Sequence, residues 1–259
     1  MAINNRIRHL PSKIIQALRY QYGSLFGHTE YSRFAIIGNA RTGSNYLLDG
    51  ILSSGSVYMY HEIFADHNRT IGENFDGILS NLYKKKERHI KHVGVKIFYY
   101  HLSDDEWDKF LEHEEFKIIH LVRKNRLRTI ISLEIALKTN EWVATPTSRN
   151  DNKNKSIRID PNKLIDQLVK IGEYEKITRD RFSGRPYLEV AYEDMTRNPD
   201  EEFLRVGNFL NLSYINPEAI RHKKQNPEGL RELIVNYDDV EKALIGTPHE
   251  IYLERDPNS

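Results

Sequence analysis

The residues best suited to chemistry lie in a glycine-containing turn between an apolar strand and the start of a helix. The segment reads Arg33-Phe-Ala-Ile-Ile-Gly-Asn-Ala-Arg-Thr-Gly-Ser-Asn-Tyr-Leu-Leu. Such a turn directs several backbone N–H groups and the positive end of a helix dipole toward one point, where a phosphate or sulfate group binds. The sequence therefore predicts an anion site formed by Arg41, Thr42, Gly43, Ser44, Asn45 and Tyr46.

The spacing of this turn is close to that of a nucleotide-binding loop but lacks two of its functional residues. Gly38 and Gly43 match the glycines of G-x-x-x-x-G-K-[ST]. Ser44 replaces the lysine, and Asn45 replaces the hydroxyl residue that binds magnesium. An ordinary ATPase is therefore disfavoured, and the positive charge of the loop comes from Arg41 instead. An interpretation in which the glycines serve packing alone is weakened by the polar residues at other strand ends.

Polar residues also occur in or after the other predicted strands. In an open parallel sheet, ligands bind outside the carboxyl ends of the strands, so residues at these positions are candidates for a site. Glu62 follows the second predicted strand, Lys96 lies in the third, Arg123 ends the fourth, and Tyr192 follows the fifth. The positions of these residues favour a ligand-binding function over a purely structural one.

Two of these segments resemble signatures of a known enzyme family. Arg-Thr-Gly-Ser-Asn-Tyr-Leu after a strand resembles the loop that holds the 5′-phosphosulfate in sulfotransferases that use 3′-phosphoadenosine 5′-phosphosulfate (PAPS). His120-Leu-Val-Arg123-Lys-Asn-Arg-Leu-Arg-Thr-Ile-Ile-Ser132 resembles the second signature of that family. The likeness is closest to the bacterial carbohydrate branch, which includes nodulation-factor and trehalose-type sulfotransferases.

The resemblance implies a function and a set of roles. It implies metal-independent, in-line transfer of the sulfuryl group from PAPS to a hydroxyl of a carbohydrate or glycolipid. Glu62 would be the general base, with His61 as a weaker substitute, and Lys96 would approach the bridging oxygen and the sulfonate. Arg41 and the loop amides would stabilise the departing 5′-phosphate. Alternatively, Glu62 is solvated or pairs with Arg41, and Lys96 faces water from an edge strand.

The resemblance also implies which residues bind the rest of the nucleotide. Arg123 and Ser132 would hold the 3′-phosphate, although the spacing leaves Lys124 as an alternative cation. Tyr192 would lie near the adenine, while the acids that follow it fix a loop. In the basic C-terminal stretch, Lys224 and Gln225 would close over the 3′-phosphate, although this stretch lacks the Arg-Lys-Gly form of animal relatives. Lys124, Arg126 and Arg128 are expected to form a solvated face.

Composition limits the classes of function. The chain has 259 residues, 39% of them hydrophobic, and a net charge of +1, so no global charge favours nucleic acid or a membrane. It contains no cysteine, which excludes disulfides and thiolate sites, and its histidines lack metal-ligand spacing. No apolar run is long enough to span a bilayer, so we expect a soluble cytoplasmic protein of undetermined oligomeric state.

Alternating strand and helix signals predict an α/β fold with three layers, in which a mainly parallel sheet is flanked by helices, as in nucleotide kinases. We expect one domain over residues 1–259, with a basic helical arm at 1–30 and a mobile loop at 145–158. The arm docks on the domain or contacts a membrane surface peripherally. Predicted strands are 34–38, 57–60, 93–99, 116–122 and 186–191. One helix is predicted from Asn45 to Ser53, and others start after Ser103, Arg123, Asp160 and Asn198.

Two other functions stay open from the sequence. One is a nucleotide kinase or another nucleoside-triphosphate enzyme on the same fold. The other is a protein without catalytic activity that binds anions, RNA or lipid through its basic N-terminal arm.

Overall fold

The computed structural model describes residues 26–142, 155–220 and 226–253. The chain divides into two compact units: unit 1 comprises Met1–Ala35 and Gly55–Lys117, and unit 2 comprises Ile36–Ser54 and Ile118–Ser259. Most of the expected N-terminal arm, most of the loop at 145–158, and both Lys224 and Gln225 lie outside the described residues. The expectation of a single domain stays a prediction.

The strands form one five-stranded sheet in the order β2-β3-β1-β4-β5. β2 pairs in parallel with β3, and β4 pairs in parallel with β5. Helices connect the strands along the chain, so the predicted α/β class with a parallel sheet is confirmed. The strands are β1 (Ser32–Gly38), β2 (Val57–Tyr60), β3 (His92–Phe98), β4 (Phe116–Val122) and β5 (Tyr187–Ala191).

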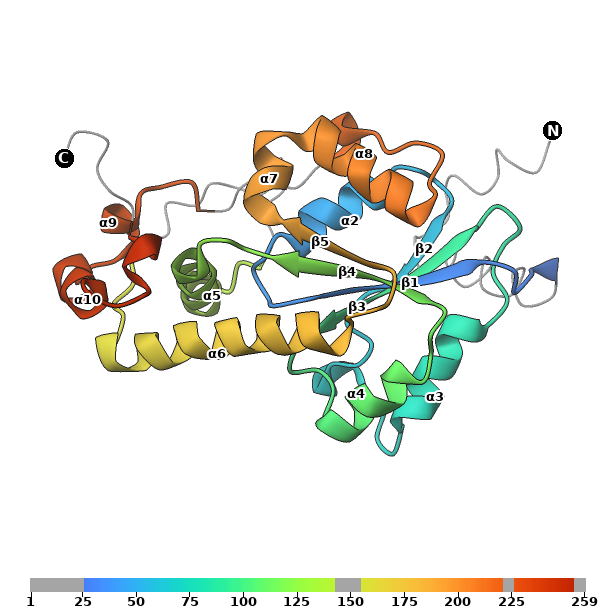
Figure 1. Cartoon of the computed structure of the whole chain (residues 1–259), viewed down its shortest axis with the longest axis horizontal. Coiled ribbons are helices and arrows are strands. Elements are labelled where there is room, and N and C mark those ends of the chain that lie inside the picture. Colours follow the sequence, from blue (N-terminus) through green and yellow to red (C-terminus); the bar gives the residue numbers. More distant parts are fainter. Residues whose placement is uncertain (1–25, 143–154, 221–225, 254–259) are drawn as a thin grey trace. The chain divides into compact units, whose positions relative to one another are not determined.

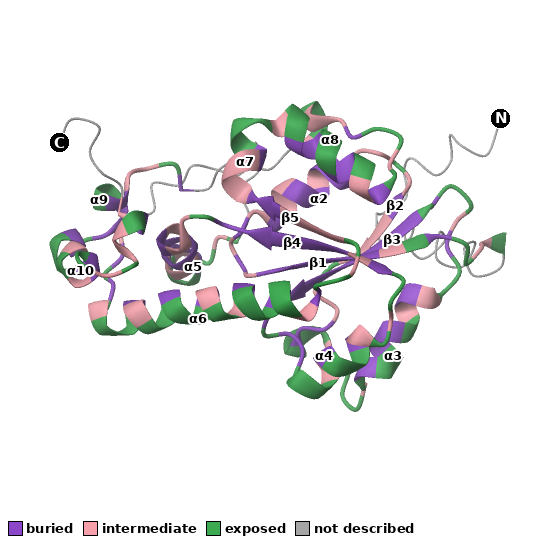
Figure 2. Ribbon diagram, viewed as in Figure 1, coloured by how far each residue is buried: buried purple, intermediate pink, exposed green. Residues whose placement is uncertain are grey.

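In unit 1, short helices lie between the parallel strands β2 and β3 in the chain, and one more follows β3. All residues of β3 are buried (Figure 2), including its two polar side chains, His92 and Lys96. α4 (Asp104–Leu111) begins with the predicted capping box, in which the Ser103 hydroxyl and the Glu106 carboxylate each accept a backbone N–H. The remaining helical segments are η2 (Asp66–Asn68), α3 (Phe75–Ser80) and η3 (Asn81–Tyr83).

In unit 2 helices lie on both sides of β4 and β5 (Figure 1): α2, α7 and α8 lie on one side and α6 on the other. The Asp160 side chain accepts the N–H of Asn162, and Pro161 occupies the first position of α6, as the sequence predicts. No helix within the described ranges has the length and hydropathy needed to cross a bilayer. The helices are α2 (Ser44–Leu52), α5 (Arg126–Thr139), α6 (Pro161–Arg181), α7 (Tyr192–Arg197), α8 (Pro199–Leu210), η4 (Pro217–Ala219), α9 (Leu230–Leu233), α10 (Tyr237–Leu244) and η5 (Glu250–Tyr252).

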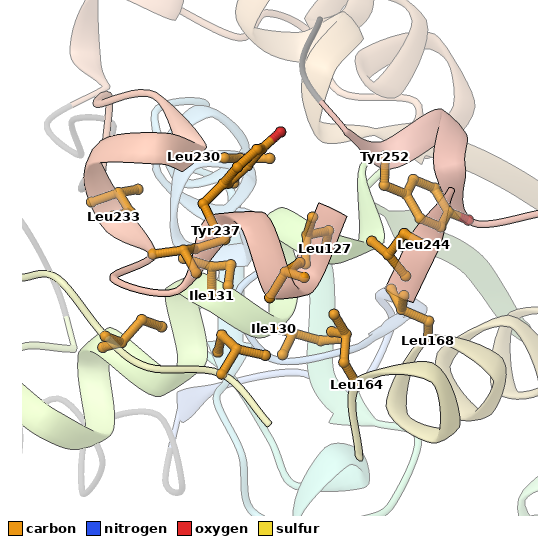
Figure 3. Packing of buried hydrophobic residues seen from close by; sticks show 14 of the residues in the cluster. Leu127, Ile130, Ile131, Leu164, Leu168, Leu230, Leu233, Tyr237, Leu244 and Tyr252 are labelled. Carbon is orange, nitrogen blue, oxygen red and sulfur yellow. The ribbon is translucent and has the colours of Figure 1, made fainter. Parts of the chain in front are cut away.

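A large apolar core in unit 2 holds α5 in place (Figure 3). Leu127 and Ile131 of α5 pack in one cluster with Leu164 of α6 and Leu244 of α10. Ile157, in the described end (155–158) of the expected mobile loop, joins this core: it is buried, donates its N–H to the Leu233 carbonyl and accepts the N–H of Val235. α5 is therefore a fixed helix on which functional side chains can be positioned.

The contact between α2 and α8 gives a test of this packing. A Cβ atom on Gly50 would lie 2.2 Å from Cε1 of Phe203, whereas one on Gly207 would meet only Ile215, at 3.6 Å or more. We expect Gly50→Ala to lower the free energy of unfolding by about 1–3 kcal/mol, because the added methyl overpacks the interface. Gly207→Ala, the matched control, should raise it by up to about 1 kcal/mol through helix propensity. Urea denaturation measures both; equal effects would contradict the packing.

Candidate active site

The turn between β1 and α2 leaves the start of α2 open. Gly43 is the N-cap residue with φ of 87°, and no side chain caps this helix end. The first bond of the helix runs from the Leu47 N–H to the Gly43 carbonyl, at 3.1 Å. The N–H groups of the first turn, on Ser44, Asn45 and Tyr46, therefore provide the helix terminus that the sequence predicts for an anion.

Short hydrogen bonds hold the turn itself. The Asn39 side chain accepts the Ala40 N–H at 3.0 Å, and the Thr42 hydroxyl donates to the Asn39 carbonyl at 2.8 Å. Arg41 has φ of 68°, a left-handed conformation that is uncommon for a residue with a side chain and that recurs at functional sites. Asn39 was not among the predicted site residues, although asparagine is a frequent turn residue.

The Arg41 guanidinium contacts residues in and beyond α5. Its Nε donates to the Ser132 hydroxyl at 3.0 Å, and its Nη1 donates to the Trp142 carbonyl at 2.7 Å. Burial is the main cause that lowers the pKa of Arg41, and the charge of Arg123 lowers it further. Trp142 contributes through its backbone, so no residue-type signal in the sequence could have predicted this contact.

Arg123 lies next to Arg41 and Tyr192. It is 9% exposed at the end of β4, and its Nη1 is 3.3 Å from the Arg41 carbonyl. Its guanidinium carbon lies 4.9 Å from the ring centre of Tyr192, where a cation and an aromatic ring attract each other. A Cβ on Gly43 would lie 2.3 Å from this ring. Glycine is therefore required there both by its positive φ and by the position of Tyr192.

The acids after Tyr192 fix the loop between β4 and α5, as the resemblance implies. The Glu193 carboxylate accepts the N–H groups of Lys124 and Asn125, at 2.9 and 3.2 Å. The Lys124 ammonium lies 2.6 Å from the Asp194 carboxylate. Lys124 is thus held by Asp194, while the buried Arg123 lies beside Arg41.

We predicted that Lys124, Arg126 and Arg128 form a solvated face. This prediction is wrong for Arg126 and Arg128. Arg126 pairs with the buried Glu175 of α6 at 2.6 Å. Arg128 donates to the carbonyls of Asn226 and Glu228, at 3.3 and 2.9 Å. Both side chains are half-buried because α6 and the C-terminal segment pack against α5, which periodicity alone does not reveal.

A C-terminal residue that the prediction did not select also reaches Ser132. Asn226 is 7% exposed, and its Nδ2 lies 3.4 Å from the Ser132 hydroxyl. The predicted neighbours Lys224 and Gln225 lie outside the described residues. The prediction favoured charged and long side chains because that stretch is basic. The contact with Ser132 comes instead from the neutral side-chain amide of Asn226.

In unit 1, Glu62 and Lys96 form an ion pair with a separation of 2.7 Å. Lys96 is 5% exposed, and its strand β3 lies between β2 and β1 in the sheet. The interpretation of Lys96 as a lysine that faces water from an edge strand is therefore wrong. The pair presents a carboxylate, which can accept a proton, and an ammonium group, which can stabilise negative charge.

Arg69 holds the segment that carries Glu62. Its guanidinium binds both carboxylate oxygens of Glu106, at 2.6 and 3.0 Å, and it donates to the carbonyls of Phe64 and His101, both at 2.9 Å. Two-pronged arginine–carboxylate pairs fix geometry as well as charge. Arg69 therefore connects the segment after β2 to the segment after β3.

Two histidines belong to the same unit as this ion pair. His101 is 7% exposed, and its Nδ1 accepts the N–H of Phe98 at 3.1 Å. Burial, with a further contribution from the charge of Lys96, lowers the pKa of His101 to about 4. Desolvation and Lys96 also lower the pKa of His61. Among the described residues, no three His, Asp or Glu side chains are grouped so that they could hold a metal ion.

The chain is similar in sequence to a known protein. No family model matches the chain. Nodulation protein H from Rhizobium tropici is 24% identical over 242 residues, which cover 87% of this chain and 94% of that protein. The motifs predicted the branch that includes nodulation-factor sulfotransferases, and this match confirms the prediction. The chain is similar to Nodulation protein H over most of the length of both proteins.

Several solved structures are also similar to this chain. A sulfotransferase from Alicyclobacillus acidocaldarius is 15% identical with a TM-score of 0.47 and covers 87% of this chain and 96% of its own. The sulfotransferase domain of the Synechococcus PCC 7002 olefin synthase is 18% identical with a TM-score of 0.41. The match covers 89% of this chain and 86% of that domain's chain. Mouse sulfotransferase SULT7A1 complexed with PAP is 13% identical with a TM-score of 0.42. The match covers 77% of this chain and 66% of the mouse chain.

The lowered pKa of His101 should make the stability of the protein depend on pH. Its pKa is about 4 in the folded protein and 6.5 without perturbation, so the unfolded chain binds more protons between these values. Unfolding therefore becomes more favourable as the pH falls through this window. We expect the wild type to lose stability relative to His101→Asn between pH 6.5 and 4, because asparagine keeps an acceptor for Phe98 and does not titrate. Denaturant unfolding at pH 7, 5.5 and 4.5 measures this; parallel pH profiles would contradict it.

Proposed function

We propose that this protein transfers the sulfuryl group of PAPS to a hydroxyl of a carbohydrate or glycolipid acceptor. One observation carries the proposal: in unit 2, Arg41, Arg123 and Ser132 gather beside a turn whose helix start is not capped by any side chain. Two guanidinium groups, a hydroxyl and helix amides suit a ligand with several anionic groups. The relationship to Nodulation protein H supports the assignment, and the acceptor class rests on the family resemblance alone.

In the proposed reaction the protein supplies positioning and charge. The acceptor oxygen forms a bond to sulfur while the bond between sulfur and the bridging phosphate oxygen breaks. The acceptor proton passes to a base, and 3′-phosphoadenosine 5′-phosphate (PAP) leaves. Group transfer of this kind needs little covalent chemistry from the protein, as in phosphoryl transfer. Fixed N–H groups and cations that face the developing negative charge provide most of the acceleration.

Within this mechanism we assign Glu62 as the base and Lys96 as the cation that stabilises the bridging oxygen. Their ion pair supports the assignment, because each group is held in a defined orientation before a substrate binds. Burying the Lys96 side chain is costly without an anionic partner, and Glu62 provides one in this structure. We assign Tyr192 to the adenine and the amides of Ser44, Asn45 and Tyr46 to the phosphosulfate.

Ligand-induced stabilisation tests the nucleotide specificity. A ligand that binds only the folded state raises the melting temperature in proportion to the logarithm of its concentration over its dissociation constant, once in excess. We expect PAP to stabilise the protein more than AMP or ATP with magnesium at equal concentrations, because PAP has a phosphate on both the 3′ and the 5′ position of its ribose. Differential scanning fluorimetry measures the shifts.

Other results of that measurement would replace the proposal. Stronger stabilisation by ATP with magnesium would indicate a kinase or another nucleoside-triphosphate enzyme. No response to any nucleotide, together with salt-sensitive binding of RNA or anionic vesicles that persists in Arg41→Ala, would indicate a binding protein without catalytic activity.

The role of Glu62 is tested by an isosteric substitution. Glu62→Gln keeps an oxygen that accepts from Lys96 but removes the base, so turnover should fall by about 10²–10⁴-fold while PAP binding is retained. Sulfate transfer from radiolabelled PAPS to candidate sugar acceptors measures turnover. His61→Asn is the matched control and should change turnover by much less. A large loss in His61→Asn with little loss in Glu62→Gln would instead make His61 the base.

A further inference from the structure

A basic segment of unit 1 lies outside the candidate active site. Residues 84–92 read Lys-Lys-Lys-Glu-Arg-His-Ile-Lys-His, with five Lys or Arg residues and one acid. The acid is Glu87, and its Oε2 lies 3.3 Å from Nδ1 of His89. Four cationic side chains of the segment are exposed, and we call them the basic patch: Lys84, Lys85, Arg88 and Lys91. The patch is a local excess of positive charge on a chain whose net charge is only +1.

The backbone under the basic patch is held by the segment that precedes β1. His28 and Lys86 form an antiparallel bridge, in which each N–H donates to the carbonyl of the other at 2.9 Å. The Tyr31 hydroxyl lies 2.7 Å from the Lys84 carbonyl. Phe26, two residues before the bridge, is 59% exposed. The exposed cations therefore stand on a fixed backbone, with an exposed aromatic ring near them.

Lys86, under the patch, has no carboxylate partner among the described residues. It is 6% exposed, and its ammonium donates to the carbonyls of Asn81 and Lys84, at 3.3 and 2.7 Å. Three ring centres lie 5.3 to 5.7 Å from the ammonium, those of Tyr31, Tyr58 and Tyr60. The pKa of Lys86 is lowered to about 8, mainly by burial and further by the charges of Lys84 and Arg33. Carbonyls and aromatic rings stabilise this charge without neutralising it, so Lys86 adds to the positive potential of the patch.

An anionic lipid surface matches these features. The cations are spread along an exposed segment, as is required for contact with many headgroups at once. Each Lys or Arg close to an anionic membrane adds to the attraction. An exposed aromatic side chain such as Phe26 adds apolar contact at the level of the headgroups. The patch and Phe26 together therefore supply both contributions to binding at a membrane surface.

The position of the patch within unit 1 leaves the ion pair uncovered. β2 and β3 run parallel, the patch precedes β3, and Glu62 follows β2. The patch and Glu62 consequently lie at opposite ends of this pair of strands. A membrane bound at the patch does not cover the end at which Glu62 lies.

We propose that the basic patch, together with Phe26, docks this protein on an anionic membrane surface. The inference goes beyond the proposed function and does not depend on it, because docking needs neither nucleotide nor acceptor. It assigns the membrane contact to the patch rather than to the basic residues of the expected N-terminal arm.

Co-sedimentation of the full chain with lipid vesicles tests the docking. The vesicles contain phosphatidylcholine alone or with an equal part of phosphatidylglycerol, and we expect the wild type to bind only the anionic ones. Replacing the three cations in Lys84→Gln, Lys85→Gln and Arg88→Gln together should lower the partition coefficient by about 30-fold or more at low salt. Added salt should weaken wild-type binding through screening. Phe26→Ser should lower the partition coefficient by about fivefold, since apolar contact is lost.

A second triple variant is the matched control, in which Lys163→Gln, Lys170→Gln and Lys176→Gln remove the same charge from exposed positions of α6. It should bind as the wild type does, and circular dichroism should show all variants folded. If neither triple variant loses affinity, the contact lies elsewhere; if both lose it equally, net charge is responsible. Either result overturns the inference.

Two results with the wild type would also overturn the docking proposal. One is the absence of binding to anionic vesicles. The other is salt-sensitive binding of RNA that the patch variant loses, without any binding to vesicles, which would make the patch a nucleic-acid site. PAP binding is measured separately, so a failure of the proposed function is distinguishable from a failure of this inference.

Discussion

The close approach of Arg41 and Arg123 is the constraint on which the rest of unit 2 depends. Two guanidinium groups near each other repel, and the low exposure of Arg123 removes much of the water that would screen the repulsion. The surrounding groups compensate in part. The Arg41 and Trp142 carbonyls and the Ser132 hydroxyl accept hydrogen bonds, and the Tyr192 ring faces Arg123. The remaining repulsion costs stability, and an anion bound beside both guanidinium groups would offset it.

Rigid supports keep those charges in place. Ser132 lies on α5, which the apolar core fixes against α6 and α10 (Figure 3). The Asn125 side chain caps α5, and Glu193 holds the loop before it through two backbone N–H groups. These contacts connect the strand ends to the helix start with hydrogen bonds rather than with flexible loops. Positioning of this quality is what electrostatic catalysis requires, because groups that move lose their advantage over water.

Unit 1 places its charges in a similar way. Glu62 and Lys96 come from segments that are far apart in the sequence, and the pair brings one carboxylate to one ammonium group. Arg69 contacts the segments after β2 and β3 through Glu106 and two carbonyls. A buried strand lysine with a carboxylate partner avoids the large penalty of an unpaired buried charge. The same pair holds the carboxylate in one orientation.

The sequence by itself determined the α/β fold, the parallel strands, the capped helix starts at Ser103 and Asp160, and the glycine-containing turn that ends at Gly43 before α2. These features arise from local rules, namely apolar runs, capping residues and glycine geometry, which act within a few residues. The family resemblance also came from contiguous residues. Only the tertiary structure decided that Lys96 is buried and paired with Glu62, that Arg126 and Arg128 are half-buried, and that the Arg41 side chain contacts Ser132. Those outcomes depend on which segments, distant in the sequence, pack together. No pattern within a few residues encodes such packing.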